Sequence, residues 1–150
     1  MSVIRSKLDT RSDDYRDNLA EMERLWAEVA EQLAAVPSIG GQRYVDRHRA
    51  RGKMLARERV EQLVDPDTPL LELSPLAGWG SEFPIGCGTV NAIGVVSGVE
   101  CAISAIDMTY RGGSMNPRTI DKSARFQEIA RRNRLPLINL NESAGADLPY

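Results

Sequence analysis

The sequence has few of the residues that build the common metal and thiol sites, and each shortage excludes a class of protein. Its 150 residues include one histidine and two cysteines, and neither cysteine belongs to a CxxC pair. A zinc site of paired cysteines is therefore not indicated, and nothing independent supports a disulfide. Because Cys87 and Cys101 both lie in apolar, strand-like surroundings, we expect two buried free thiols.

Long apolar runs and an excess of one charge are also absent. No window is apolar enough to span a membrane, and the charged start "MSVIRSKLDTRSDDYRDN" lacks the apolar core of a signal peptide. The net charge at pH 7 is −2, which gives no general attraction to nucleic acid or to anionic membranes. We expect no nucleic-acid or membrane partner. The expected compartment is the cytoplasm, or the mitochondrial matrix if the source is eukaryotic and a leader was removed.

The first 68 residues are predicted to be helical. Apolar side chains recur at three- and four-residue steps from Tyr15 to Leu33, which places them on one face of a long helix. Thr10 or Ser12 could cap this helix, and its apolar face could pack on its own chain or on a neighbour. Two short basic helices around Gly52 are expected next, with surface ion pairs such as Arg57 to Glu61.

From about residue 70 the pattern becomes that of a sheet with one helix. The expected elements are a strand at 70–74, a hairpin within 89–109 that turns at Ser97-Gly98, a helix at 118–134 and a short buried strand at 135–140. Both hairpin strands are mostly apolar, so both faces of the sheet should be covered. The residues of the helix expected to face the core are Ile120, Ala124, Phe126, Ile129 and Ala130.

Three stretches, in this order, resemble the N-terminal part of the carboxyltransferase (β) subunits of biotin-dependent acyl-CoA carboxylases of the methylcrotonyl-CoA and propionyl-CoA type. They are "RGKMLARERVEQLVDPDTPLLEL" (51–73), "GVVSGVECAISAIDMTYRGGSMNP" (94–117) and "KSARFQEIARRNRLPLINLNESAGADLP" (122–149). The resemblance implies an α/β protein. A helical N-terminal extension (1–68) would precede the first ββα units of a crotonase-like (ClpP/crotonase) domain (69–150), which is truncated because those subunits are much longer.

The same resemblance assigns a role to the turn "SAGA" (143–146). The backbone N–H groups of Ala144 and Gly145 are expected to form an oxyanion hole for an enolate or for a biotin oxyanion, with Ala146 beside the cofactor. The family carries glycine where this chain has Ala144, and alanine would be strained if that position needs a positive φ.

The resemblance also implies where coenzyme A would lie. Arg51, Gly52 and Lys53 are expected to contact its phosphates, and Gly112 and Gly113 of "RGGS" are expected beside the cofactor. It implies neither a metal in this chain nor a side-chain general base. His48, the sole histidine, is expected to be a solvated surface residue.

The implied reaction moves the carboxyl group from carboxybiotin to an acyl-CoA through an enolate. The acyl-CoA would be methylcrotonyl- or propionyl-CoA, with acetyl-CoA and geranyl-CoA also open, and "GADLP" (145–149) is closer to the methylcrotonyl pattern. The expected partners are an α subunit with the biotin carboxylase and biotin carrier, and further β subunits in a homo-oligomer. This chain alone is expected to be inactive.

Two alternatives remain. One is another crotonase-superfamily acyl-CoA enzyme, a hydratase or decarboxylase, although that class does not explain "RGKMLARERV" (51–60). The other is an inactive fragment that acts only as an assembly module through its long N-terminal helix. A half-domain would leave an unpaired sheet edge, so we expect the isolated chain to be unstable or to aggregate.

Overall fold

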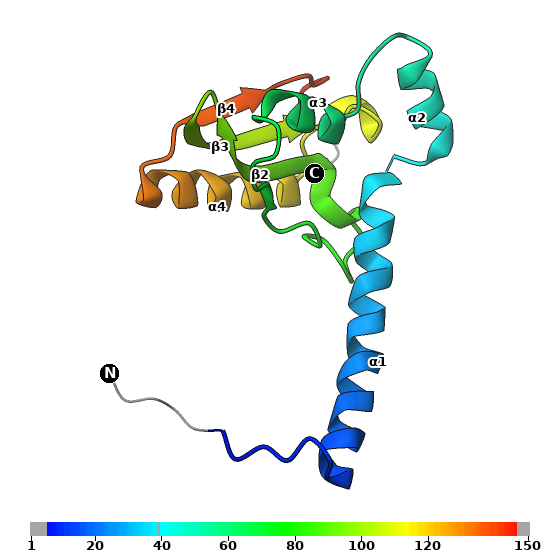
Figure 1. The fold of residues 1–150 in the computed structure, drawn as a ribbon. Helices are drawn as coiled ribbons and strands as arrows, with labels where there is room; N and C mark the ends of the chain where they lie inside the picture. Colours follow the sequence, from blue (N-terminus) through cyan, green and yellow to red (C-terminus); the bar gives the residue numbers. More distant parts are fainter. Residues whose placement is uncertain (1–5, 39, 147–150) are drawn as a thin grey trace. The chain divides into compact units, whose positions relative to one another are not determined.

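The computed structural model describes residues 6–38 and 40–146, in two compact units, 1–34 and 35–150. The pattern "GADLP" at 145–149 therefore lies mostly outside the described residues. The elements, in chain order (Figure 1), are α1 (Asp13–Ala35), η1 (Val36–Ser38), α2 (Gln42–Arg49), α3 (Ala56–Leu63), β1 (Leu71–Glu72), η2 (Ile85–Gly88), β2 (Thr89–Val96), β3 (Val99–Ile106), η3 (Arg111–Gly113), α4 (Pro117–Asn133) and β4 (Leu137–Leu140). The proposed domain boundary between residues 68 and 69 stays a prediction.

The first unit is built on the long helix α1, as the spacing of apolar residues predicts. Ser12 caps it, since its Oγ accepts a hydrogen bond from the Tyr15 N–H at 3.2 Å. A single amphipathic helix cannot bury its apolar stripe against itself.

The second unit holds a four-stranded sheet in the order β1-β2-β3-β4. The strands β2 and β3 form the predicted hairpin, and β4 runs parallel to β3 with Ala102 opposite Leu137. Asp65 holds the hairpin turn, because its carboxylate accepts the N–H groups of Ser97 at 2.8 Å and Gly98 at 2.7 Å. The antiparallel hairpin followed by a helix and a parallel strand confirms the predicted ββα order.

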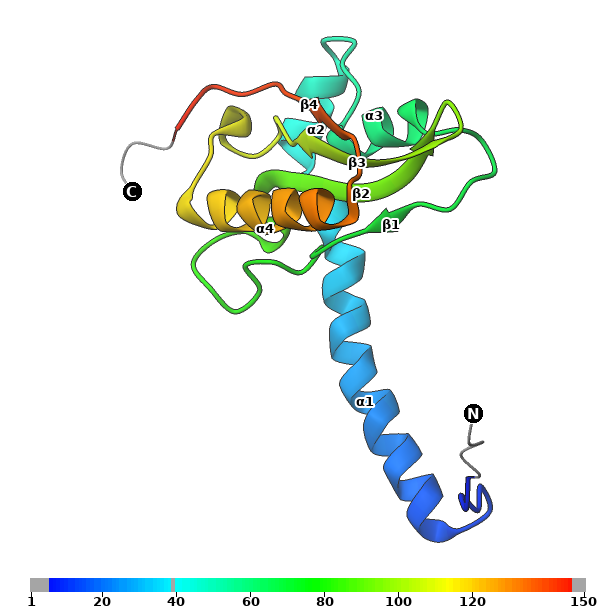
Figure 2. The same ribbon diagram turned by 90° about the vertical axis from the view of Figure 1, so that its left-hand side faces the viewer.

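Both faces of the sheet are covered, as predicted from its apolar strands (Figure 2). On one face Val60 of α3 is fully buried in a cluster with Ala92 and Ile103 of the sheet. On the other, Phe126 and Ala130 of α4 pack against Ala102. Neighbouring residues of β3 thus face opposite layers, as the two-residue period of a strand requires.

The predicted inward face of α4 is partly wrong. Ile120 is 58% exposed and Ala124 is exposed as well, whereas Thr119 and Lys122 are buried together with Phe126 and Ala130. Lys122 can lie inside because its ammonium group donates hydrogen bonds to the carbonyl oxygens of Gly86 at 3.0 Å and Thr89 at 2.7 Å. Those acceptors come from residues more than thirty positions away, and helical periodicity cannot reveal them.

Two further local predictions are corrected, and one is confirmed. The strand β4 is half-exposed rather than buried, with Leu137 38% exposed, because it lies at the edge of the described sheet. Arg57 pairs with Glu72 of β1 and not with Glu61. Both cysteines are buried free thiols, as expected, and burial raises the pKa of the Cys87 thiol.

Candidate functional site

Two loops meet where the parallel strands β3 and β4 end. The loop 107–116 follows β3 and the loop 141–146 follows β4, so both start at the carboxyl ends of adjacent strands, a common place for a site in α/β proteins. The Ala144 N–H donates to the Gly112 carbonyl oxygen at 2.9 Å, and the Met115 N–H donates to that of Gly145 at 2.9 Å. The Ser143 hydroxyl donates to the Gly113 carbonyl oxygen at 2.7 Å.

Gly113 makes this close approach possible. Its φ is +73°, and a Cβ there would lie 2.6 Å from the Glu142 carbonyl oxygen and 2.9 Å from Met108 Sδ. No side chain fits such a space, and L residues avoid this conformation. Gly113 of "RGGS" is thus needed to seat the loop 141–146.

The two N–H groups expected to form an oxyanion hole already have acceptors. The Ala144 N–H donates to Gly112, and the Gly145 N–H donates to Ser143 Oγ at 3.0 Å. Ala146 is exposed, and its N–H has no acceptor among the described residues. The positive φ of the turn falls on Gly145, at +111°, and not on Ala144. Alanine at 144 is therefore unstrained, and the oxyanion assignment stays a prediction.

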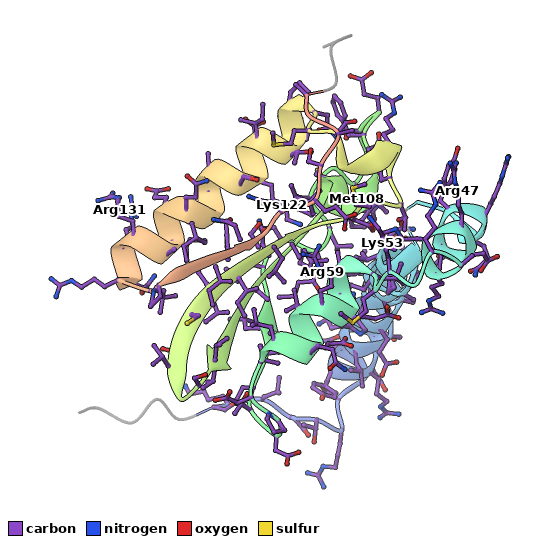
Figure 3. The ribbon with its side chains drawn as sticks, turned by 90° about the horizontal axis from the view of Figure 1, so that it is seen from above. Arg47, Lys53, Arg59, Met108, Lys122 and Arg131 are labelled. Atoms are coloured by element: carbon purple, nitrogen blue, oxygen red, sulfur yellow. The ribbon has the colours of Figure 1, made fainter. Side chains whose placement is uncertain are left out.

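A basic hollow of about 200 Å³ lies beside these loops. Figure 3 labels three of the residues that line it, Arg47, Lys53 and Met108. The hollow brings together Arg51, Lys53 and Gly112, three of the residues expected near coenzyme A; Gly52 lies between the first two in the chain but does not line the hollow. His48 is half-buried in its wall rather than fully solvated, with Nε2 3.0 Å from the Met54 carbonyl oxygen. The lining residues are Tyr44, Arg47, His48, Arg51, Lys53, Met108 and Gly112.

An ion pair connects this hollow to the turn. The Lys53 ammonium contacts Glu142 Oε1, and Arg59 Nη1 lies 3.9 Å from Glu142 Oε2. The hydrogen bond from Lys53 lowers the pKa of Glu142 below its ordinary value. Sequence reasoning missed both Glu142 and Arg59. An acid directly before the turn was the available signal, but its partner lies 89 positions away.

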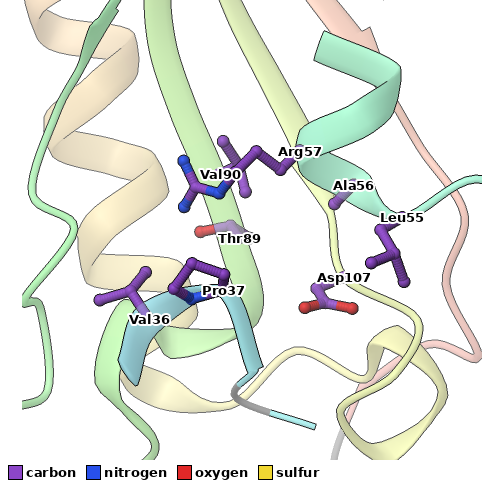
Figure 4. Close-up of a pocket in the computed structure, with 8 residues that line it drawn as sticks. All are labelled: Val36, Pro37, Leu55, Ala56, Arg57, Thr89, Val90 and Asp107. Atoms are coloured by element: carbon purple, nitrogen blue, oxygen red, sulfur yellow. The ribbon is translucent and has the colours of Figure 1, made fainter. Parts of the chain in front are cut away.

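Two other hollows fit a ligand less well. One of about 20 Å³, beside Arg57, Thr89 and Asp107, holds no more than a water molecule (Figure 4). A second, of about 240 Å³, lies between α4 and the sheet and is lined by uncharged side chains alone, so it does not suit a polyanion. Of these three hollows, the basic one fits a polyanion best, and together with the two loops it is the candidate site.

The described residues hold neither a cluster of metal ligands nor a membrane-spanning helix. No group of three or more His, Cys, Asp or Glu residues there is placed to hold a metal ion. None of the helices within residues 6–38 and 40–146 is long and apolar enough to cross a membrane.

The ββα order, the parallel β3–β4 pair and the glycine loops after it define an α/β domain of the crotonase-like class. The carboxyl transferase domain family matches residues 47–149. The chain belongs to this family.

Relatives and solved structures agree with this family. The chain is 51% identical over 147 residues to a probable biotin-dependent acyl-coenzyme A carboxylase beta2 subunit of Mycobacterium tuberculosis, covering 98% of this chain and 28% of that protein. It is 44% identical to a probable mitochondrial methylcrotonoyl-CoA carboxylase beta chain of Drosophila melanogaster, covering 99% and 26%. The crystal structure of the beta subunit of P. aeruginosa geranyl-CoA carboxylase matches with a TM-score of 0.76 and 35% identity, over 99% of this chain and 28% of that one. The chain thus spans about a quarter of the length of these relatives.

Proposed function

We propose that this chain supplies part of the carboxyltransferase site of a biotin-dependent acyl-CoA carboxylase. The observation that carries the proposal is the junction of the loops 107–116 and 141–146 beside a basic hollow. Carboxybiotin, held by a partner, would supply the carboxyl group. The residues of this chain would bind the thioester and stabilise the negative charge that develops on it.

The basic hollow suits the phosphates of coenzyme A. Arg47 and Arg51 both line it, and neither has a carboxylate partner among the described residues. Guanidinium groups bind phosphate oxygens in pairs of hydrogen bonds. Arg51, with Gly52 and Lys53 beside it in the chain, is therefore assigned to the phosphate end, and Gly112 to the passage of the pantetheine arm.

The turn 143–146 suits an oxygen that becomes negative in the reaction. An N–H donor that is fixed and aimed at such an oxygen before substrate arrives contributes about 3 kcal/mol in comparable sites. Ala146 offers an N–H without an acceptor among the described residues. The Ala144 and Gly145 N–H groups could donate to the substrate oxygen only after giving up their present acceptors. These are the Gly112 carbonyl oxygen and Ser143 Oγ.

Membership of the family supports a wider assembly. We assign this chain, as the N-terminal part of a longer β subunit, to an assembly with further β subunits and a biotin-carrying α subunit. The proposed acyl group is methylcrotonyl, propionyl, acetyl or geranyl. Relatives include bacterial and mitochondrial proteins, which supports a place in the cytoplasm or the mitochondrial matrix.

The test uses the complete subunit that carries residues 1–150, purified with its biotin-carrying partner. The unmodified assembly should carboxylate at least one of these acyl-CoAs in a biotin-dependent way. Arg51→Met should raise KM for that acyl-CoA about tenfold, because one phosphate contact is lost. An assembly that hydrates or decarboxylates acyl-CoA instead, without biotin, would contradict the proposal.

A further inference from the structure

Beyond this function, on which the inference rests, we propose that Lys53 and Glu142 are a positioning pair. They would hold the turn 143–146 in place, while Arg47 and Arg51 bind phosphate. Lys53 would then be assigned to the turn and not to the coenzyme.

Each carboxylate oxygen of Glu142 has a cationic partner. The Lys53 ammonium contacts Glu142 Oε1, and Arg59 lies against the other carboxylate oxygen at 3.9 Å. Glu142 is only 29% exposed and receives two cations from α3 and the segment before it. Its position is therefore set by groups that are remote in sequence.

Glu142 lies immediately before the turn 143–146 in the chain. It directly precedes Ser143, and its own carbonyl oxygen lies against Gly113, where a Cβ would come within 2.6 Å. Ser143 and Ala144 then bond to the carbonyl oxygens of Gly113 and Gly112. Glu142 is thus tied at its side chain and packed at its backbone, and a shift there would move the N–H groups that follow.

The backbone around Lys53, the other member of the pair, is held by local hydrogen bonds. The connection from α2 to α3 carries Lys53 and is closed by the contact between His48 Nε2 and the Met54 carbonyl oxygen. The N–H groups of Gly52 and Lys53 also donate within it, to Arg49 and His48. The backbone position of Lys53 is therefore fixed by this turn, and so is the point from which its side chain reaches Glu142.

Lys53 differs from the arginines of the same hollow in whether its charge is already paired. Lys53 is neutralised by Glu142, whereas Arg47 and Arg51 have no carboxylate partner among the described residues. A phosphate that bound Lys53 would have to break the existing pair. Binding Arg47 and Arg51 requires no such exchange, so these two are the better phosphate ligands.

The experiment compares four single substitutions in the complete subunit with its biotin-carrying partner. Lys53→Met and Glu142→Gln should each lower kcat about tenfold, because displaced N–H donors stabilise the transition state less, and should change KM for acyl-CoA less than twofold. Arg51→Met should instead raise KM. The matched control is Arg49→Met, which removes a similarly exposed ion pair, with Glu58, away from the turn, and should change neither constant.

Charge exchange separates positioning from misfolding. The single variants Lys53→Glu and Glu142→Lys should lose activity, and the double variant K53E/E142K should recover part of kcat, because the unchanged Arg59 opposes a cation at position 142. A Lys53→Met enzyme with raised KM and unchanged kcat would make Lys53 a phosphate ligand and overturn the proposal. Unchanged kcat in Glu142→Gln would overturn it as well.

Hydrogen exchange of the turn amides tests the positioning role of Lys53 even if the assembly does not carboxylate acyl-CoA. The amides of Ala144 and Gly145 are hydrogen-bonded and should exchange at least tenfold faster in Lys53→Met than in Arg49→Met. Equal exchange in these two variants would overturn the positioning role. Absent carboxylation by the unmodified assembly would overturn only the proposed function.

Discussion

Arg57 on α3 and Glu72 on β1 form an ion pair with two contacts. Arg57 Nη2 lies 3.0 Å from Glu72 Oε1, and Nη1 contacts Oε2. The hydrogen bonds that Arg57 donates to Glu72 raise the pKa of Arg57 above its ordinary value. The pair joins α3, which follows the segment that carries Lys53, to the first strand of the sheet.

We expect Glu72→Gln to lower the free energy of unfolding by about 1–3 kcal/mol, because it leaves a partly buried guanidinium group without its carboxylate. Urea unfolding followed by circular dichroism measures the change. The control is Arg118→Met, which removes an exposed pair with Asp121 and should cost less than about 0.5 kcal/mol. Equal losses in both variants would show that the Arg57 pair has no special role.

Gly113→Ala should destabilise the protein by about 3 kcal/mol or more and abolish the seating of the turn. The new Cβ would clash with the Glu142 carbonyl oxygen in a backbone conformation that L residues avoid. Gly52→Ala is the matched control, because Gly52 has a similar φ of +71° but no atom within 4 Å of an added Cβ, and should cost about 1 kcal/mol. Thermal unfolding of both variants tests this, and similar losses would contradict the steric argument.

Lys122 should make stability depend on pH in the alkaline range. Burial lowers its pKa from the ordinary 10.5 to about 8, so between these values the unfolded chain keeps a proton that the folded chain has released. The free energy of unfolding should therefore rise with pH from about 8 to 10.5, by as much as about 3 kcal/mol from this group. Below pH 8 both states are protonated, and the group adds no dependence.

The difference between the unmodified protein and Lys122→Met isolates this effect from other alkaline titrations. The rise between pH 8 and 10.5 should flatten in Lys122→Met and persist in Lys7→Met, which removes an exposed lysine. Urea unfolding at several pH values measures it. An undiminished rise in Lys122→Met would assign the dependence to another group.

The edge strand β4 should promote aggregation of the 150-residue chain expressed by itself. Leu137 is exposed on the last strand of the described sheet, and edge strands offer unpaired backbone groups to other chains. Leu137→Lys should lower light scattering during incubation at high concentration. Ile120→Lys, at a more exposed apolar position on α4, should have less effect, because a helix presents no unpaired edge. A greater effect of Ile120→Lys would point to apolar surface instead.

The periodic elements were predictable because local spacing alone encodes them. The stripe from Tyr15 to Leu33 predicts α1, and the apolar runs on both sides of Ser97-Gly98 predict the hairpin. The edge position of β4 was not predictable, since strand periodicity does not reveal where a strand lies in its sheet. The inward face of α4 failed at Lys122 for a similar reason, as a lysine becomes buried only when distant carbonyl oxygens accept from it.

The sequence by itself determined the family, the order of the elements and the two glycine-containing segments, because these depend on residue types in a fixed linear order. Only the tertiary structure decided that Glu142 meets Lys53, that Gly113 seats the turn, and that the N–H groups of Ala144 and Gly145 are already bonded. The first two of these contacts, and the bond of Ala144, join segments that are distant in the sequence and meet only on folding. The bond of Gly145 depends on the backbone geometry of the turn itself. Side-chain partners across 30 to 90 positions leave no periodic trace in a single sequence.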